Sequence, residues 1–261
     1  MAKNLWVGVW DLHYPQIHKP TWTAILDFLT KNKKKIAGFY FGGDQFHNDE
    51  ISHHTAGRPL LRPPGSYKNN TTRFDKNILT ALEDILPADA NKIWQIGNHD
   101  NWESDLVERM PEFQGTVERP LLLNLESRGW QVIQMGDSYK LGKLTLLHGE
   151  VLSGIGNQAS AYHAKRAVET YCSSVVYGHM HSPQSYTKVL PHKQNDKWQA
   201  WCAPTAGIVN PLYLRNRPTA WLNGFVIIEL HNPENKNSNF NVYTIIVSDG
   251  KFCFGGEVYG A

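Results

Sequence analysis

Five short apolar runs constrain the fold of this chain most strongly, because each one ends in a side chain that can bind a metal ion. They cover residues 5–10, 36–41, 93–96, 144–147 and 174–177. An apolar run of this length, bounded by glycine or polar residues, is typical of a buried β-strand. Strands that alternate with helices favour a parallel sheet with crossover connections. The carboxyl ends of such strands lie at one edge, where open α/β folds bind ligands.

The side chains that follow the five runs form one set of metal-competent donors. The set comprises Asp11, His13, Asp44, Asn98, His148, His179 and His181. Carboxylate, amide and imidazole donors suit Mn, Fe, Zn, Ni or Co, and a two-metal site needs about seven protein donors with one bridging carboxylate. His99 remains outside this set, so its imidazole is available for proton transfer.

The stretch Gly97-Asn98-His99-Asp100 also has a simpler interpretation. Asn and Asp are common turn residues, and Asn98 or Asp100 could cap a helix over residues 103–110. Taken alone, the stretch does not decide between a turn and a metal site. The five strand ends taken together favour metal binding.

The order of the motifs resembles that of the calcineurin-like metallophosphoesterase superfamily. Asp-x-His, Gly-Asp, Gly-Asn-His-Asp, His-Gly and Gly-His-x-His follow one another within residues 5–183. The resemblance implies an α/β fold, a four-layer α/β/β/α sandwich of two mixed β-sheets flanked by helices. It implies one metal held by Asp11, His13, Asp44 and His181, and a second held by Asp44, Asn98, His148 and His179, with Asp44 bridging.

The resemblance also implies an enzyme, a metal-dependent phosphoric ester hydrolase acting on phosphomonoesters or phosphodiesters. Its cofactors would be two divalent ions, Mn in the first place and Fe, Zn, Ni or Co as alternatives. A metal-bridging hydroxide would attack phosphorus, His99 would be the general acid, and Asp100 would orient His99. Residues 201–210 and 221–225 further resemble small phage and prophage metallophosphoesterases, which adds nucleotides and nucleic acids to the candidate substrates.

Two alternatives remain open at this stage. One is a nuclease or cyclic-nucleotide phosphodiesterase with the same mechanism, which would need a basic groove. The other is a protein that binds a phosphorylated ligand without turning it over. Turnover of a generic aryl phosphate ester would separate this second alternative from the enzymes.

Length and composition place few further limits on function. The chain has 261 residues, which fits a single domain over residues 1–261. A net charge of +2 predicts no general affinity for nucleic acid. Three widely spaced cysteines suggest neither disulfides nor a zinc knuckle. The chain has no apolar run of membrane-spanning length and no signal peptide, so we expect a cytoplasmic protein without membrane contact, of unknown oligomeric state.

Two polar loops are candidates for substrate contacts. Residues 45–72 form the least regular part of the sequence and are predicted to be a loop insertion over the site. A second loop covers residues 210–218. Imidazolium and guanidinium groups complement phosphate charge, although solvated side chains are an equally good explanation. The candidate side chains are His53, His54, Arg58, Arg215 and Arg217.

Helical spacing predicts helices over residues 72–86 and 159–171, with His163 at the surface of the latter. After His181 the pattern changes to strands and turns. Strands at 198–202, 221–230 and 240–247 are predicted to form a second, antiparallel sheet, and Asp249-Gly250 is a predicted hairpin turn.

Overall fold

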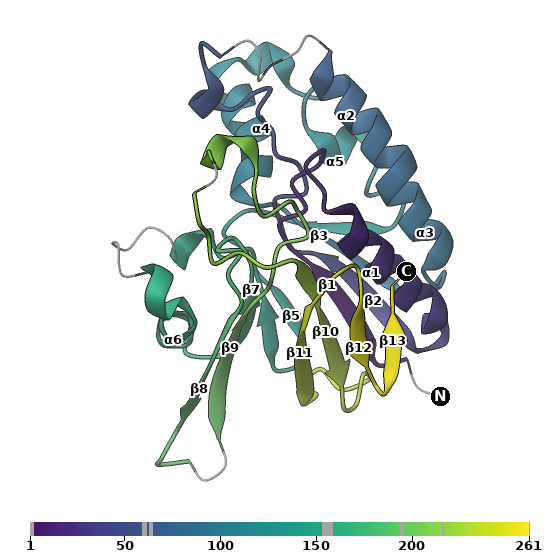
Figure 1. The fold of residues 1–261 in the computed structure, drawn as a ribbon, viewed down its shortest axis with the longest axis vertical. Helices are drawn as coiled ribbons and strands as arrows, with labels where there is room; N and C mark the ends of the chain where they lie inside the picture. Colours follow the sequence, from purple (N-terminus) through teal and green to yellow (C-terminus); the bar gives the residue numbers. More distant parts are fainter. Residues whose placement is uncertain are drawn as a thin grey trace.

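Two β-sheets pack face to face, and helices cover their outer faces (Figure 1). The structure, a computed structural model, describes residues 3–58, 62, 65–152, 159–193, 196–215 and 217–260. Five residues of the predicted loop insertion, 59–61, 63 and 64, lie outside these ranges, as does residue 216 of the second polar loop. Among the described residues, no helix is both long and apolar enough to cross a membrane.

The first sheet has six strands in the order β11-β10-β1-β2-β3-β4. These are β1 (Leu5–Val9), β2 (Ile36–Phe41), β3 (Asn91–Gln95), β4 (Trp130–Ile133), β10 (Gly224–Leu230) and β11 (Phe240–Ile246). Strands β1 to β4 are parallel, whereas β10 pairs antiparallel with both β1 and β11. The predicted alternation of strands and crossovers is therefore confirmed for β1 to β4.

The second sheet has five strands in the order β5-β6-β7-β9-β8. These are β5 (Tyr139–Leu141), β6 (Leu144–Leu146), β7 (Ser174–Tyr177), β8 (Gln184–Val189) and β9 (Lys197–Cys202). Strands β6, β7 and β9 are parallel, and the edge strands β5 and β8 are antiparallel to their neighbours. Both sheets are mixed, as predicted. A separate hairpin joins β12 (Phe252–Phe254) to β13 (Glu257–Tyr259).

Helices α1 (Lys19–Lys31), α2 (Ser66–Phe74) and α3 (Ala81–Ile85) cover the first sheet, and α6 (Ala159–Tyr171) covers the second (Figure 1). The chain therefore forms the predicted four layers. Helices α4 (Asn98–Arg109) and α5 (Arg119–Leu122) follow β3.

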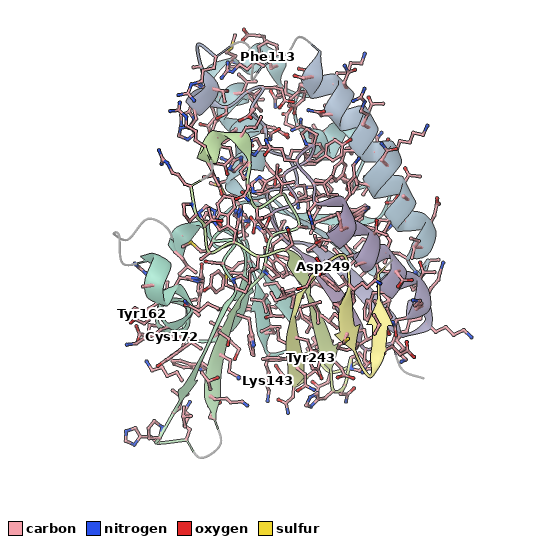
Figure 2. The ribbon with its side chains drawn as sticks, in the orientation of Figure 1. Phe113, Lys143, Tyr162, Cys172, Tyr243 and Asp249 are labelled. Atoms are coloured by element: carbon pink, nitrogen blue, oxygen red, sulfur yellow. The ribbon has the colours of Figure 1, made fainter. Side chains whose placement is uncertain are left out.

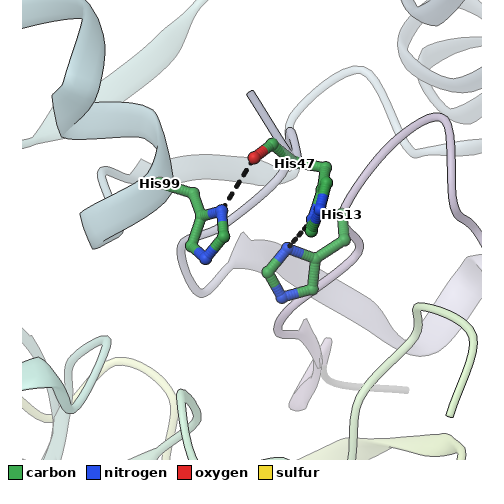
Figure 3. A group of neighbouring side chains, drawn as sticks. All are labelled: His13, His47 and His99. Carbon is green, nitrogen blue, oxygen red and sulfur yellow. Dashed lines mark hydrogen bonds between the residues drawn. The ribbon is translucent and has the colours of Figure 1, made fainter. Parts of the chain in front are cut away.

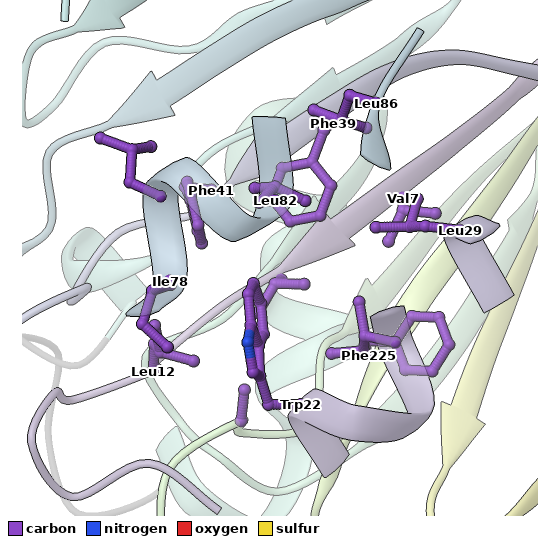
Figure 4. Packing of buried hydrophobic residues seen from close by; sticks show 14 of the residues in the cluster. Val7, Leu12, Trp22, Leu29, Phe39, Phe41, Ile78, Leu82, Leu86 and Phe225 are labelled. Carbon is purple, nitrogen blue, oxygen red and sulfur yellow. The ribbon is translucent and has the colours of Figure 1, made fainter. Parts of the chain in front are cut away.

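Alternating side chains of β1 divide the apolar core into two parts. Val7 and Val9 face the helices, where they pack with Trp22 and Phe39 (Figure 4). Trp6 lies between the two sheets. This period of two is what a strand buried on both faces requires. Burying a large apolar side chain stabilises the fold by about 1.5–3 kcal/mol, so both layers of core contribute.

The predicted membership of the second sheet is wrong for two strands. Of the three C-terminal strands, only β9 lies in that sheet, whereas β10 and β11 extend the first sheet beside β1. The physical reason is visible in β10, where Val226 and Ile228 face the space between the sheets while Phe225 and Ile227 face the helices. A strand that is apolar on both faces needs cover on both faces, and the position next to β1 provides it.

Two predicted helices begin earlier than expected. Helix α2 begins at Ser66, within the stretch predicted to be a loop, and continues through a π-helical segment, Asp75–Thr80, into α3. Helix α4 begins at Asn98 rather than at residue 103. Its first turn is stabilised because the Gly97 N–H donates to the Asp100 carboxylate at 3.0 Å. The Asn98-His99-Asp100 stretch is therefore the start of a helix as well as part of the site described below.

Candidate metal centre

The structure brings all seven predicted donors together where the carboxyl ends of β1, β2, β3, β6 and β7 meet. Among the described residues, three groups have ligand atoms that all lie within 4.8 Å of one another. Two of them contain expected ligands, Asp11, His13 and His181 in one and Asp44, His148 and His179 in the other. Asn98 joins the second group through its Oδ1, 3.0 Å from His148 Nε2. The third group consists of His13 with His47 and His99, which are not in the expected ligand sets.

Each aspartate has one oxygen fixed by the backbone and one that faces imidazoles. Asp44 Oδ1 accepts a hydrogen bond from the His99 N–H at 2.8 Å, and its Oδ2 lies 3.4 Å from His148 Nε2 and 3.9 Å from His13 Nε2. Asp11 Oδ2 accepts from the His179 N–H at 2.8 Å, and its Oδ1 lies 3.4 Å from His181 Nε2. Because Asp44 Oδ2 faces histidines of both groups, its position suits a bridging carboxylate.

Two glycines make room for these carboxylates. A Cβ atom at Gly97 would lie 2.2 Å from Asp44 Oδ1, and one at Gly178 would lie 2.6 Å from Asp11 Oδ2. Both distances are far shorter than any non-bonded contact, so a side chain at either position would displace a carboxylate. The glycine in each motif is therefore a steric requirement of the site.

The backbone of the site is strained at five of the donors. A left-handed conformation occurs at Asp11 (φ 54°), His13 (φ 48°), Asp44 (φ 55°), His179 (φ 65°) and His181 (φ 55°). Strained conformations of this kind persist only where the surrounding structure enforces them, and they cluster at functional sites. The strain turns successive donors out of the strand direction and toward one point.

Two carbonyl groups fix which histidine nitrogen is free. His148 Nδ1 lies 2.9 Å from the Gly42 carbonyl oxygen, and His99 Nδ1 lies 2.7 Å from the His47 carbonyl oxygen. A carbonyl can only accept, so Nδ1 carries the proton in both rings. The Nε2 atoms of both rings are left to face Asp44 Oδ2, at 3.4 Å for His148 and 4.0 Å for His99.

His47 is a site residue that the sequence analysis missed. Its ring is buried, with Nε2 3.3 Å from Asp49 Oδ2 and Nδ1 3.5 Å from His13 Nδ1 (Figure 3). The carboxylate accepts from Nε2–H, so His47 Nδ1 can accept the proton of His13 Nδ1. This leaves His13 Nε2 without a proton, and its lone pair faces Asp44 and His181. His47 therefore orients a ligand in the way that outer-shell groups do at metal sites.

The predicted contact between Asp100 and His99 is wrong. Asp100 is buried and accepts backbone N–H groups of Gln45, Phe46 and Gly97 at 3.3, 3.2 and 3.0 Å. The orienting partner of His99 is the His47 carbonyl instead. Burial, together with the charges of Asp44 and Glu103, raises the pKa of Asp100 to about 8. Asp100 thus ties the loop after β2 to the start of α4.

The charges of the site separate the pKa values of its members. Burial opposes ionisation of Asp44, but the charges of His148 and His99 outweigh it and hold its pKa well below the usual value. Burial acts to lower the pKa of His148, yet the Asp44 carboxylate raises it to about 10. Burial lowers the pKa of His13 well below normal, and that of His179 to about 4, with His148 adding to the latter effect. His13 and His179 are therefore neutral at pH 7, the form that binds metals.

The residues fit a divalent cation. Asp11 Oδ1 is buried without a hydrogen-bond partner in the part of the chain that the structure describes. Buried polar atoms are normally paired, and an unpaired carboxylate oxygen is especially costly. His13 Nε2 and His181 Nε2 lie 3.1 Å apart, where a shared cation would satisfy both nitrogens and Asp11 Oδ1.

Two of the five predicted substrate-contact residues lie near the site, and the other three cannot be linked to it by a contact among the described residues. His53 and His54 are exposed and lie beside Trp102, with ring centroids 6.0 and 5.8 Å from its own, and Trp102 in turn contacts His99. Their side chains are near the site. The other three candidates are exposed and form no side-chain hydrogen bond or ion pair with any described residue; they are Arg58, Arg215 and Arg217. For these three a substrate contact stays a prediction.

His163 is not the surface histidine that the sequence suggested. It is buried between α6 and the second sheet, with Nδ1 2.5 Å from the Tyr177 hydroxyl and Nε2 3.3 Å from Ser182 Oγ. Both ring nitrogens have partners, which explains how an imidazole is accommodated in an apolar layer. His163 belongs to none of the three groups of metal-competent side chains found among the described residues.

Comparison with known proteins gives only loose similarities. No family model matches the chain, and no curated protein matches it. The chain is similar to a conserved uncharacterized protein, a predicted phosphoesterase, from Streptococcus pneumoniae TIGR4 (11% identity over 94% of this chain and 91% of that one, TM-score 0.34). It is also similar to Vps29 from Chaetomium thermophilum (9% identity over 92% and 96%, TM-score 0.37). Similarities with such low TM-scores indicate nothing about function.

Proposed function

We propose that this chain is a dinuclear metal-dependent phosphoesterase that hydrolyses phosphomonoesters or phosphodiesters. The observation that carries the proposal is the pair of aspartates. Each keeps one oxygen on a backbone N–H and presents the other to histidines, and Asp44 does so between the two donor groups. Together with the motif order, this arrangement supports two divalent ions sharing Asp44.

The geometry supports the two ligand sets that the motif resemblance implies. Asp11, His13, Asp44 and His181 would hold one ion, and Asp44, Asn98, His148 and His179 the other. When bound, the ions would supply Lewis acidity, which lowers the pKa of water and attracts phosphate oxygens. Mn is our first choice, and Fe, Zn, Ni and Co suit the same donors.

His99 would supply the proton transfer that the metal ligands do not provide. Its Nδ1–H is held by the His47 carbonyl, so its Nε2 points toward Asp44 and the donor groups. A proton at Nε2 can pass to the leaving oxygen of the ester. Burial lowers the pKa of His99 from its usual value, which makes its imidazolium a stronger acid. Because Asn98 is neutral, the donor set carries one negative charge fewer than an aspartate would give, which favours an anionic substrate.

The test begins with protein stripped by a chelator and reloaded with Mn, Ni, Co or Zn. Bound metal is measured by elemental analysis, and turnover is measured with bis(p-nitrophenyl) phosphate and p-nitrophenyl phosphate. We expect about two equivalents of metal and hydrolysis that stops on chelation. The preferred ester separates a diesterase from a monoesterase. Two bound equivalents without turnover of either ester would contradict the enzyme and favour a protein that only binds phosphorylated ligands.

A further inference from the structure

Three aromatic side chains border the candidate metal centre, and none of them is needed to bind metal. We call Trp102, Tyr213 and Trp221 the aromatic rim. Trp102 lies in α4, Tyr213 in the 3-10 helix Leu212–Leu214, and Trp221 in the loop before β10. Three separate segments thus deliver a large ring to one place.

Each ring of the rim contacts a different histidine of the site. The centroid distances are 4.2 Å for Trp102 and His99, 5.6 Å for Tyr213 and His47, and 4.3 Å for Trp221 and His181. These three histidines in turn surround His13, with centroids 4.8, 5.4 and 5.0 Å from its ring for His99, His47 and His181. The rim therefore encloses the part of the site that holds His13.

The rim is only partly covered by protein. Tyr213 is 51% exposed although one face of its ring is stacked on His47 with an interplanar angle of 16°. Trp102 and Trp221 are half-buried, and Leu212 beside Tyr213 is 93% exposed. Exposed apolar side chains that gather beside a polar site mark a candidate binding surface, whereas singly scattered ones do not. The exposed ring of Tyr213 offers an apolar plane next to a site whose other groups are polar or charged.

We propose that the aromatic rim is a binding subsite for a planar aromatic group of the ester, such as a nucleobase. The proposal rests on the proposed phosphoesterase function, because it describes what the phosphate is attached to. Stacking on an aromatic side chain tolerates any base, since every base has a π face. The exposed histidines beside Trp102, His53 and His54, extend the same aromatic wall, with their own rings 3.8 Å apart.

The experiment compares two ligands with the same phosphate, AMP and ribose 5-phosphate, by titration calorimetry on Mn-loaded protein. Stacking on one ring predicts that AMP binds about 5- to 150-fold more tightly. In Tyr213→Leu, which keeps an apolar side chain but removes the ring, this ratio should fall toward one, while the affinity for ribose 5-phosphate stays unchanged. Trp102→Leu and Trp221→Leu should each lower the ratio as well.

The matched control is Tyr162→Leu, because Tyr162 is 72% exposed and belongs to α6, which covers the second sheet and carries no ring of the rim (Figure 2). In this variant, the ratio of the affinity for AMP to the affinity for ribose 5-phosphate should equal that of the unaltered protein. Equal affinities for AMP and ribose 5-phosphate would overturn the subsite and leave the phosphoesterase proposal standing. A high ratio that no rim substitution changes would also overturn it.

Two further ligands distinguish a failure of the subsite proposal from a failure of the phosphoesterase proposal. If neither AMP nor ribose 5-phosphate binds, the phosphoesterase proposal fails, and adenosine decides the subsite: binding lost in Tyr213→Leu supports it, and no binding overturns it. A single-stranded tetranucleotide identifies the source of the base. Tighter binding than AMP indicates nucleic acid, and equal binding indicates a mononucleotide; both results support the subsite.

Discussion

Two buried clusters of charged side chains lie next to each other in this protein, and they differ in how their polar atoms are satisfied. One is the candidate metal centre. The other, which we call the Arg119 cluster, consists of Asn48, Thr71, Glu103 and Arg119. Arg119 is 1% exposed, lies 2.7 Å from Glu103 Oε1, also donates to Asn48 and to Thr71, and is stacked between the rings of Phe46 and Tyr67.

The Arg119 cluster is complete without any ligand. The Arg119 guanidinium and the Glu103 carboxylate pair with each other. Asn48 Nδ2 donates a hydrogen bond to the His99 carbonyl oxygen at 2.8 Å, which links the cluster to the site. The candidate metal centre instead leaves Asp11 Oδ1 unpaired within the described residues. A network that satisfies itself stabilises the fold, whereas an unpaired buried carboxylate oxygen could be satisfied by a cation.

The sharpest test of this contrast is Asp44→Asn. Removing the bridging charge should abolish binding of one or both ions and lower turnover by about 10³-fold or more. The control is Asp249→Asn, because Asp249 has the same left-handed backbone (φ 50°) in a hairpin turn outside the site (Figure 2). Metal content and turnover should be unchanged there. Normal metal content in Asp44→Asn would contradict the bridging role.

Arg119→Met tests the other cluster. An uncompensated Glu103 carboxylate would remain buried, so the free energy of unfolding should fall by about 3–5 kcal/mol. The control is Lys31→Met, because Lys31 pairs with Asp27 at 2.8 Å while its side chain is 49% exposed. Exposed pairs contribute about 1 kcal/mol or less. Urea denaturation measures both variants, and equal losses would show that burial is not the deciding difference.

His99→Gln separates proton transfer from metal binding. Loss of a general acid should lower turnover by about 10²-fold or more, with the larger loss for esters whose leaving group is a poor one. Bound metal should remain at the level of the unaltered protein, because His99 is not in either ligand set. Elemental analysis and steady-state kinetics on the same sample make the comparison. A parallel loss of metal would instead make His99 a ligand.

The smallest effect is expected from His47→Phe. The phenyl ring can keep the stacking with Tyr213 but cannot fix His13, so metal affinity should fall about 10- to 100-fold. Competition with a chelator measures this change. His163→Phe is the control, since His163 is also buried but binds Tyr177 and Ser182. It should leave metal affinity unchanged, and equal affinities in the two variants would remove His47 from the site.

The sequence predicted the parts of the site that strand ends impose. Asp11 and His148 follow apolar runs directly, Asp44 follows one after two glycines, and parallel strands must bring their carboxyl ends together. The four layers were expected from the resemblance to the calcineurin-like superfamily. The position of β10 was not predicted, because a strand that is apolar on both faces fits the middle of either sheet, and only the antiparallel pairing with β1 decides between them.

The side chains that support the ligands were harder to find in the sequence. His47 belongs to an irregular loop, where no periodicity predicts the direction of a side chain. Asp100 is adjacent to His99 in sequence, but consecutive residues of a helix point in different directions, and Asp100 accepts N–H groups from two segments instead. The sequence did contain one signal for His47. Asp49 follows it two residues later, and this carboxylate is the partner of the His47 ring.

The left-handed backbone of the site limits which metal ligands evolution can place there. Among residues with a side chain, Asn, Asp and His adopt this conformation several times more readily than the others. The strained positions are Asp11, His13, Asp44, His179 and His181, all drawn from that group. Glutamate and cysteine bind the same metals but are poorly suited to this backbone. The proposed metal ligands can therefore be exchanged only within a small set of residue types, and the chain geometry as well as the chemistry of the ion would restrict the cations that the site accepts.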